Sequence, residues 1–131
     1  MKKKLQQLLD RSRFIRAYGF RVVTVGEAKC VLELPHRPML ERPGGIINGP
    51  ALMAAADCAM WLAIKARIGV EGDALTSELN TAFLAPAKGG HVYCTARILT
   101  MGRRRIYGVA QCHGRNGNLF SHHTVTYVRS G

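Results

Sequence analysis

The segment from residue 49 to residue 68 constrains the fold of this chain more than any other feature. It holds seven alanines among larger apolar residues, and alanine has the highest intrinsic helix propensity. Asn48 suits the N-cap of a helix, Pro50 is tolerated in the first turn, and Gly69 suits the position after the last turn. Apolar residues surround almost the whole helix, so the sequence predicts a long helix buried by the rest of the chain.

Segments typical of β-strands stand on both sides of this helix. Alternating or β-branched apolar residues predict strands over 20–25, 29–34, 74–84, 91–101, 105–113 and 119–128. A Pro- and Gly-rich loop is expected over 35–47, and a short amphipathic helix over 3–17. Asn116-Gly117 predicts a two-residue type I′ turn that pairs His113 with Phe120. The order predicts an α+β fold, with an antiparallel sheet of about six strands wrapped around the long central helix.

Length and charge narrow the class of protein. The 131 residues fit one domain of common size, which we place at 19–131 after a basic N-terminal helix at 1–18. The net charge of +11 favours anionic partners. Nucleic-acid binding is not expected, because no basic stripe interleaved with aromatic residues and no helix-turn-helix pattern appears. A sheet with unpaired edge strands and only one covered face favours a homo-oligomer, because another copy of the chain can cover what is left exposed.

Several classes of site and location are not expected. No apolar run approaches the roughly 18 residues of a membrane span, and the N-terminus lacks the apolar core of a signal peptide. The four cysteines show no metal-ligand spacing, and buried reduced thiols in a cytoplasmic protein are expected. His122 and His123 point to opposite faces of their strand. We therefore expect no metal and no cofactor.

Asp57 is the first candidate catalytic residue. It lies in the middle of the predicted buried helix, between Ala56 and Cys58. A carboxylate among apolar residues is costly unless it is paired or functional. Either a general base or a hydrogen-bonded acid at a subunit interface would explain it.

The glycine-rich entry to the helix is the second candidate. Backbone N–H groups at a helix N-terminus attract negative charge, and Gly49 would let a ligand approach the backbone closely. A thioester carbonyl on the Gly49 N–H would have its developing oxyanion stabilised. The alternative is an ordinary Gly-rich start of a helix.

Both features together resemble the PaaI-like branch of hotdog-fold acyl-CoA thioesterases. In that family a His-Gly-Gly loop opens the central helix, and an Asp follows nine residues after the His. Here Asn48, Gly49 and Pro50 stand at the loop positions, and Asp57 has the matching distance. The segment from Thr76 to Lys88, with its Pro-Ala-Lys turn, is also similar. The resemblance covers roughly residues 20 to 128.

The resemblance implies roles for individual residues. Asp57 would activate water, Gly49 would stabilise the oxyanion, and Thr76 would position water from the neighbouring subunit. Ser77 would face the other side of the strand as a substrate-binding residue. Asn48 replaces the His that helps orient the substrate carbonyl, and as a catalytic residue it could donate a hydrogen bond but not titrate. Arg42, an expected substrate-binding residue, replaces an Asn or Gln near the attacking water. Arg103, Arg104 and Arg105 at a predicted turn would hold the phosphates of coenzyme A.

The expected function is therefore hydrolysis of an aryl or medium-chain acyl-CoA. The pocket would be lined by Met53, Met60, Trp61 and Phe83 if these residues face the dimer seam. The family resemblance favours a tetramer formed as a dimer of dimers. Two alternatives remain. A hotdog dehydratase would need a titratable His near the carboxylate, and none lies in 40–57. A non-catalytic acyl-CoA-binding or sensing module is left open by the changes at Asn48 and Arg42.

Overall fold

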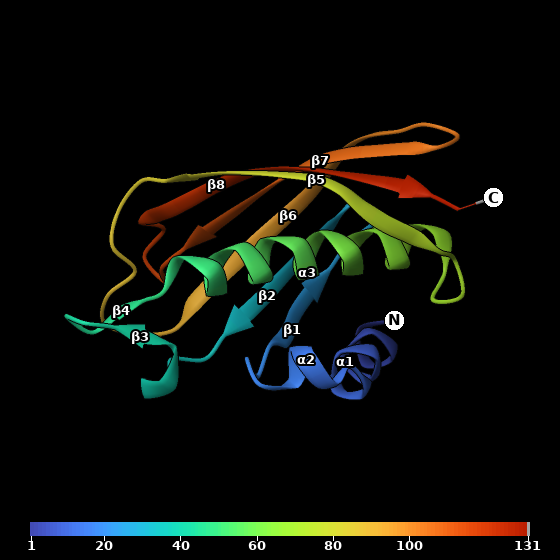
Figure 1. Cartoon of the computed structure of the whole chain (residues 1–131). Helices are drawn as coiled ribbons and strands as arrows, with labels where there is room; N and C mark the ends of the chain where they lie inside the picture. The colour runs from blue at the N-terminus through green and yellow to red at the C-terminus, as the bar shows by residue number, and fades with distance from the viewer. Residues whose placement is uncertain (131) are drawn as a thin grey trace.

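The computed structural model describes residues 1–130, so Gly131, the last residue of the expected domain, lies outside the described part. Two short helices come first and a long helix, α3, lies against a curved sheet (Figure 1). The helical elements are α1 (Lys2–Arg11), α2 (Arg13–Arg16), η1 (Pro38–Leu40) and α3 (Gly49–Ile68). The strands are β1 (Arg21–Val25), β2 (Lys29–Leu34), β3 (Glu41–Arg42), β4 (Ile46–Ile47), β5 (Ala74–Phe83), β6 (Val92–Met101), β7 (Arg105–His113) and β8 (Leu119–Arg129).

The main sheet has six antiparallel strands in the order β1-β2-β6-β7-β8-β5. It packs against α3, which contacts strands β2, β5, β6, β7 and β8. This arrangement confirms the predicted α+β hotdog fold. Strands β1 and β5 form the two edges of the sheet. β5 is therefore a ten-residue strand with one unpaired edge, and most of its side chains are exposed.

Helix α3 begins and ends where the sequence predicts. Asn48 caps it, because its side-chain oxygen accepts a hydrogen bond from the Ala51 N–H at 2.8 Å, and Gly69 follows the last turn with φ of 97°. Close packing on the sheet needs Gly108 in β7. A Cβ there would lie 2.5 Å from Met60 Cε and 2.3 Å from the Arg97 carbonyl oxygen.

The sheet does not cover α3 completely. Residues at helical spacing along one side of α3 are only half-buried, and they are Met53, Ala54, Asp57, Trp61 and Lys65. The prediction that the rest of the chain buries α3 is therefore wrong along this side of the helix. The uncovered stripe matters because it carries Asp57.

The N-terminal segment is two helices rather than one. Ser12 adopts an extended conformation between α1 and α2, with φ of −86° and ψ of 106°, so the single helix expected over 3–17 is wrong. Leu5, Leu9 and Ile15 belong to the same core cluster as α3 and the sheet. The segment thus packs on the folded domain.

Two further predictions about loops are corrected. The expected type I′ turn is absent, because Asn116 has no positive φ and the β7–β8 loop spans residues 114–118. His113 pairs with Leu119 instead of Phe120. The loop predicted over 35–47 contains η1, β3 and β4. Among residues 1–130, no helix has the length and hydropathy needed to cross a membrane.

Candidate active site

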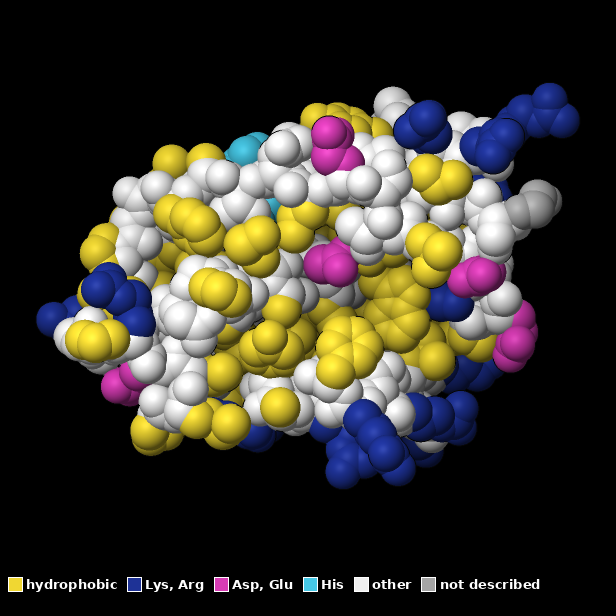
Figure 2. Space-filling view, viewed as in Figure 1, with side chains coloured by type: hydrophobic (Ala, Val, Ile, Leu, Met, Phe, Trp, Pro, Cys, Tyr) yellow, Lys and Arg dark blue, Asp and Glu magenta, His cyan; other side chains and the backbone are white. Residues whose placement is uncertain are grey.

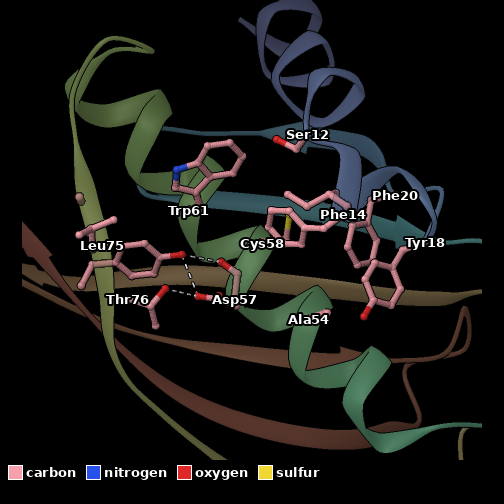
Figure 3. Close-up of a pocket in the computed structure, with 13 residues that line it drawn as sticks. Ser12, Phe14, Tyr18, Phe20, Ala54, Asp57, Cys58, Trp61, Leu75 and Thr76 are labelled. Atoms are coloured by element: carbon pink, nitrogen blue, oxygen red, sulfur yellow. Dashed lines mark hydrogen bonds between the residues drawn. The ribbon is translucent and has the colours of Figure 1, made fainter.

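Asp57 lies at the edge of a pocket on the uncovered side of α3. Its Oδ1 accepts a hydrogen bond from Thr76 Oγ1 at 2.7 Å and another from the Tyr127 hydroxyl at 2.8 Å (Figure 3). The same hydroxyl lies 3.0 Å from the Asp57 carbonyl oxygen. Within residues 1–130 no ion pair involves Asp57. Both hydrogen bonds reach one carboxylate oxygen, so Oδ2 remains available to a ligand or to water.

Strand pairing brings the two donors together. Thr76 on β5 is directly opposite Tyr127 on β8, and both side chains reach Asp57. Tyr127 is buried, and burial together with the Asp57 charge raises the pKa of its hydroxyl. Tyr127 therefore stays protonated at neutral pH and keeps donating to the carboxylate. Sequence reasoning missed Tyr127, because its only signal was an inward position on the last strand.

Thr76 and Ser77 have different surroundings. The register of β5 against β8 shifts between Thr76 and Glu78, so Ser77 is the extra residue of a β-bulge. Ser77 is exposed and opposes no residue on β8. Thr76 was expected to act at the neighbouring subunit's site, whereas here it donates to Asp57 of its own chain.

The pocket beside Asp57 is mainly apolar and has a volume of about 300 Å³. Its lining comes from three parts of the chain: the N-terminal segment, α3, and the start of β5 with the end of β8 (Figure 3). Five of the nine aromatic side chains of the protein line it, namely Phe14, Tyr18, Phe20, Trp61 and Tyr127. A carboxylate facing an apolar hollow can both bind an apolar group and activate a water molecule next to it.

The four residues predicted to form the acyl pocket do not lie together. Trp61 lines the pocket beside Asp57. Met60 is 1% exposed and packs against the sheet at Gly108, so its prediction is wrong. Met53 lies on the uncovered stripe of α3 but not in the pocket lining. Phe83 lies away from the pocket at the start of α3, where its ring covers Gly49.

The start of α3 forms a second, separate hollow. Arg42, Gly49 and Phe83 are among its lining residues. The Asn48 side chain is used by the cap and by a hydrogen bond to the Leu40 carbonyl oxygen at 2.8 Å, which leaves one amide N–H. Gly49 and Asp57 are eight positions apart on the helix, which is about 12 Å along the axis. One chain therefore does not bring Gly49 and Asp57 to one thioester carbonyl.

The three consecutive arginines lie at the turn between β6 and β7, where Gly102 N donates to the Arg105 carbonyl oxygen at 2.8 Å. Arg103, Arg104 and Arg105 are all exposed. Arg105 pairs with Val128 on β8, which pairs in turn with Leu75 on β5. Two strand spacings, roughly 10 Å, thus separate this turn from a residue that lines the pocket.

The cysteines and histidines lie elsewhere. All four cysteines are free and buried, as predicted. His123 is fully buried and lies 2.8 Å from Thr81 Oγ1 and 2.7 Å from Ser121 Oγ, while His122 is half-buried. Across the described part of the chain, no group of three or more His, Cys, Asp or Glu residues could hold a metal ion.

Comparisons with known proteins agree with this fold. An esterase-named protein of Thermoplasma acidophilum is 28% identical over 123 residues, which cover 94% of this chain and 92% of the relative. An esterase-named protein of Saccharolobus solfataricus is 26% identical and covers 95% of this chain and 83% of its own length. The solved structure of a Haemophilus influenzae thioesterase superposes with a TM-score of 0.91 at 19% identity, covering 100% of this chain and 91% of that one.

The profile of the thioesterase superfamily matches residues 44–121, which is more than half of the chain. The matched range contains the start of α3, Asp57 and Thr76, whereas the N-terminal helices and Tyr127 lie outside it. The chain therefore belongs to the thioesterase superfamily.

Proposed function

We propose that this protein is a PaaI-like acyl-CoA thioesterase that hydrolyses aryl or medium-chain acyl-CoA to the free acid and coenzyme A. The observation that carries the proposal is the Asp57 carboxylate, which faces an apolar pocket without a cationic partner among residues 1–130. Thr76 and Tyr127 hold one oxygen and leave the other free to accept a proton from water.

The reaction follows from these positions. Oδ2 of Asp57 takes a proton from a water molecule as the water oxygen forms a bond to the thioester carbonyl carbon. The carbonyl oxygen becomes an oxyanion, which a backbone N–H at the start of α3 stabilises. The C–S bond then breaks, and the proton held by Asp57 passes to the departing thiolate.

Two copies of the chain are needed to complete this site. Asp57 is level with Thr76 on β5, whereas Gly49 is level with Phe83 at the other end of the same strand. Antiparallel pairing of two β5 strands about a two-fold axis near Leu79 would bring Gly49 of a second copy beside Asp57. The oxyanion is then stabilised by one copy and the water is activated by the other.

The exposed edge of β5 supports such pairing. A long unpaired edge with apolar side chains is a template for another strand, and Leu75 and Phe83 are 68% and 55% exposed on this one. Pairing would also cover the uncovered stripe of α3. A homodimer is therefore the minimal active unit of the proposal, and a dimer of dimers is the larger assembly that the family resemblance implies.

Pocket size and charge support the substrate class. A volume of about 300 Å³ is at the small end for ligand pockets, which suits one aromatic ring or a medium-length chain. The turn that carries Arg103, Arg104 and Arg105 lies two strand spacings from a residue that lines the pocket. Because an arginine fork binds two phosphate oxygens, these side chains would hold the phosphates of coenzyme A. Cytoplasmic location and the absence of nucleic-acid partners remain predictions.

Thiol release from a panel of acyl-CoAs tests the proposal. Asp57→Asn retains a side-chain oxygen for Thr76 and Tyr127 but cannot take the proton, so the rate should fall by about 100-fold. Asp73→Asn is the matched control, because Asp73 is exposed and outside the pocket lining. If neither the intact protein nor the variant releases thiol but both bind acyl-CoA saturably, the non-catalytic acyl-CoA-binding module is the better answer.

A further inference from the structure

The N-terminal segment supplies one whole wall of the pocket beside Asp57. Figure 3 shows this wall facing α3, and its residues are Ser12, Phe14, Ile15, Tyr18 and Phe20. This whole wall precedes the part of the chain matched by the thioesterase profile, and it comes from α2 and the residues on either side of it, ahead of the sheet. The pocket's shape therefore depends on how this segment is held.

Several contacts fix the segment in place. Leu5 and Leu9 of α1 are fully or almost fully buried. The Gln6 side chain joins α1 to β1, because its Oε1 accepts from the Val22 N–H at 2.8 Å and its Nε2 donates to the Phe20 carbonyl oxygen at 3.2 Å. The Tyr18 ring stacks on Phe20 with centroids 5.1 Å apart. The break at Ser12 then lets α2 lie across the pocket instead of continuing α1.

Phe14 stands out on this anchored wall. Its side chain is 79% exposed although it lines the pocket, whereas its neighbour Ile15 is 7% exposed. A phenylalanine side chain exposed to water at the mouth of a pocket gains favourable free energy when a ligand buries it. The space-filling view shows an apolar hollow around the central acidic side chain, with basic side chains below it (Figure 2).

We propose that Phe14 is a specificity-determining residue that covers the distal part of the acyl group and holds it against Trp61 of α3. This inference rests on the proposed thioesterase function. Asp57 and Thr76 are at the β5 side of the pocket and Phe14 belongs to the opposite wall (Figure 3). With the thioester carbonyl at Asp57, a medium chain or an aromatic ring would extend toward the opposite wall and contact Phe14, whereas a short acyl group would make less of this contact. Phe14 thus selects for acyl length without touching the reacting carbonyl.

Chain-length profiles of kcat/KM test this role. The intact protein and Phe14→Ala are compared on acetyl-, butyryl-, hexanoyl- and phenylacetyl-CoA. Loss of one aromatic contact face should lower kcat/KM about 10-fold for the hexanoyl and phenylacetyl substrates, mainly through KM, and should lower it much less for acetyl-CoA. Phe14→Tyr should restore the profile. Leu99→Ala is the control, because Leu99 is 56% exposed on β6 and outside the pocket.

The single tryptophan provides a readout that does not depend on hydrolysis. Trp61 lines the pocket, so phenylacetyl-CoA added to the Asp57→Asn variant should change its fluorescence saturably, with weaker affinity when Phe14→Ala is also present. Equal losses on acetyl-CoA and hexanoyl-CoA, or no change on any substrate, would overturn the role of Phe14. If no thioester is hydrolysed but the affinity measured by fluorescence still depends on Phe14, the proposed thioesterase function is refuted and the acyl-binding role of Phe14 is supported.

Discussion

The proposed division of one active site between two chains can be tested by complementation. Asp57→Asn removes the proposed base but leaves the start of α3 intact. Gly49→Pro removes the proposed oxyanion donor but leaves Asp57 intact. The backbone should accept proline here, because Asn48 has φ of −65° and ψ of 149°, which suits a residue before proline, and proline is favoured at the first helical position. Each variant alone should have little thiol-release activity.

The expected recovery follows from the geometry. Gly49 and Asp57 of one chain are about 12 Å apart along α3, so in the proposed dimer each site takes one residue from each copy. When the two variants are co-expressed in equal amounts, half of the dimers are mixed. Each mixed dimer has one site with both defects and one site with neither. Activity should therefore return to about a quarter of the value for the intact protein.

Controls separate this result from other causes. Gly49→Ala keeps the N–H and adds only a Cβ, which would lie 3.0 Å from the exposed Phe83 ring, so this variant should retain most of its activity. Co-expression of Asp57→Asn with a chain that carries both substitutions should give no recovery, because no intact site can form. If the equal mixture of single variants stays as inactive as its components, the two-copy site is refuted.

Two further predictions concern side chains that the sequence did not single out. Tyr127→Phe removes a buried hydroxyl that donates to Asp57, so we expect a loss of about 1 kcal/mol in unfolding free energy by urea titration and a lower kcat, whereas unchanged kcat would contradict its positioning role. Although burial of Glu33 by itself raises its pKa, hydrogen bonds from His91, Arg21 and Tyr93 outweigh it and lower the pKa below 4.5. Since the folded-state pKa is below the unfolded-state value, this stabilisation is present above about pH 4.5 and is lost as pH falls through the folded pKa. The unfolding free energy of Glu33→Gln should therefore depend less on pH below about pH 4.5 than that of the intact protein, and equal dependence would contradict the reasoning.

Local patterns in the sequence were sufficient for α3 and for the strands. The alanine content, Asn48 and Gly69 define the helix through propensity and capping, which act over neighbouring residues only. Strand positions followed from alternation, and the six-strand sheet followed from their number and the buried helix. Asp57 stood out because a carboxylate is unusual in an apolar helix.

Other features depended on contacts between distant residues. Tyr127 reaches Asp57 only because β8 pairs with β5 in one particular register, and a bulge at Ser77 sets which side chains of β5 face the site. The aromatic wall at Phe14 exists because α1 is anchored and the chain turns at Ser12. Local propensity determined the elements of this protein, whereas strand register and long-range packing determined which side chains meet at Asp57, since those contacts join residues far apart in the chain.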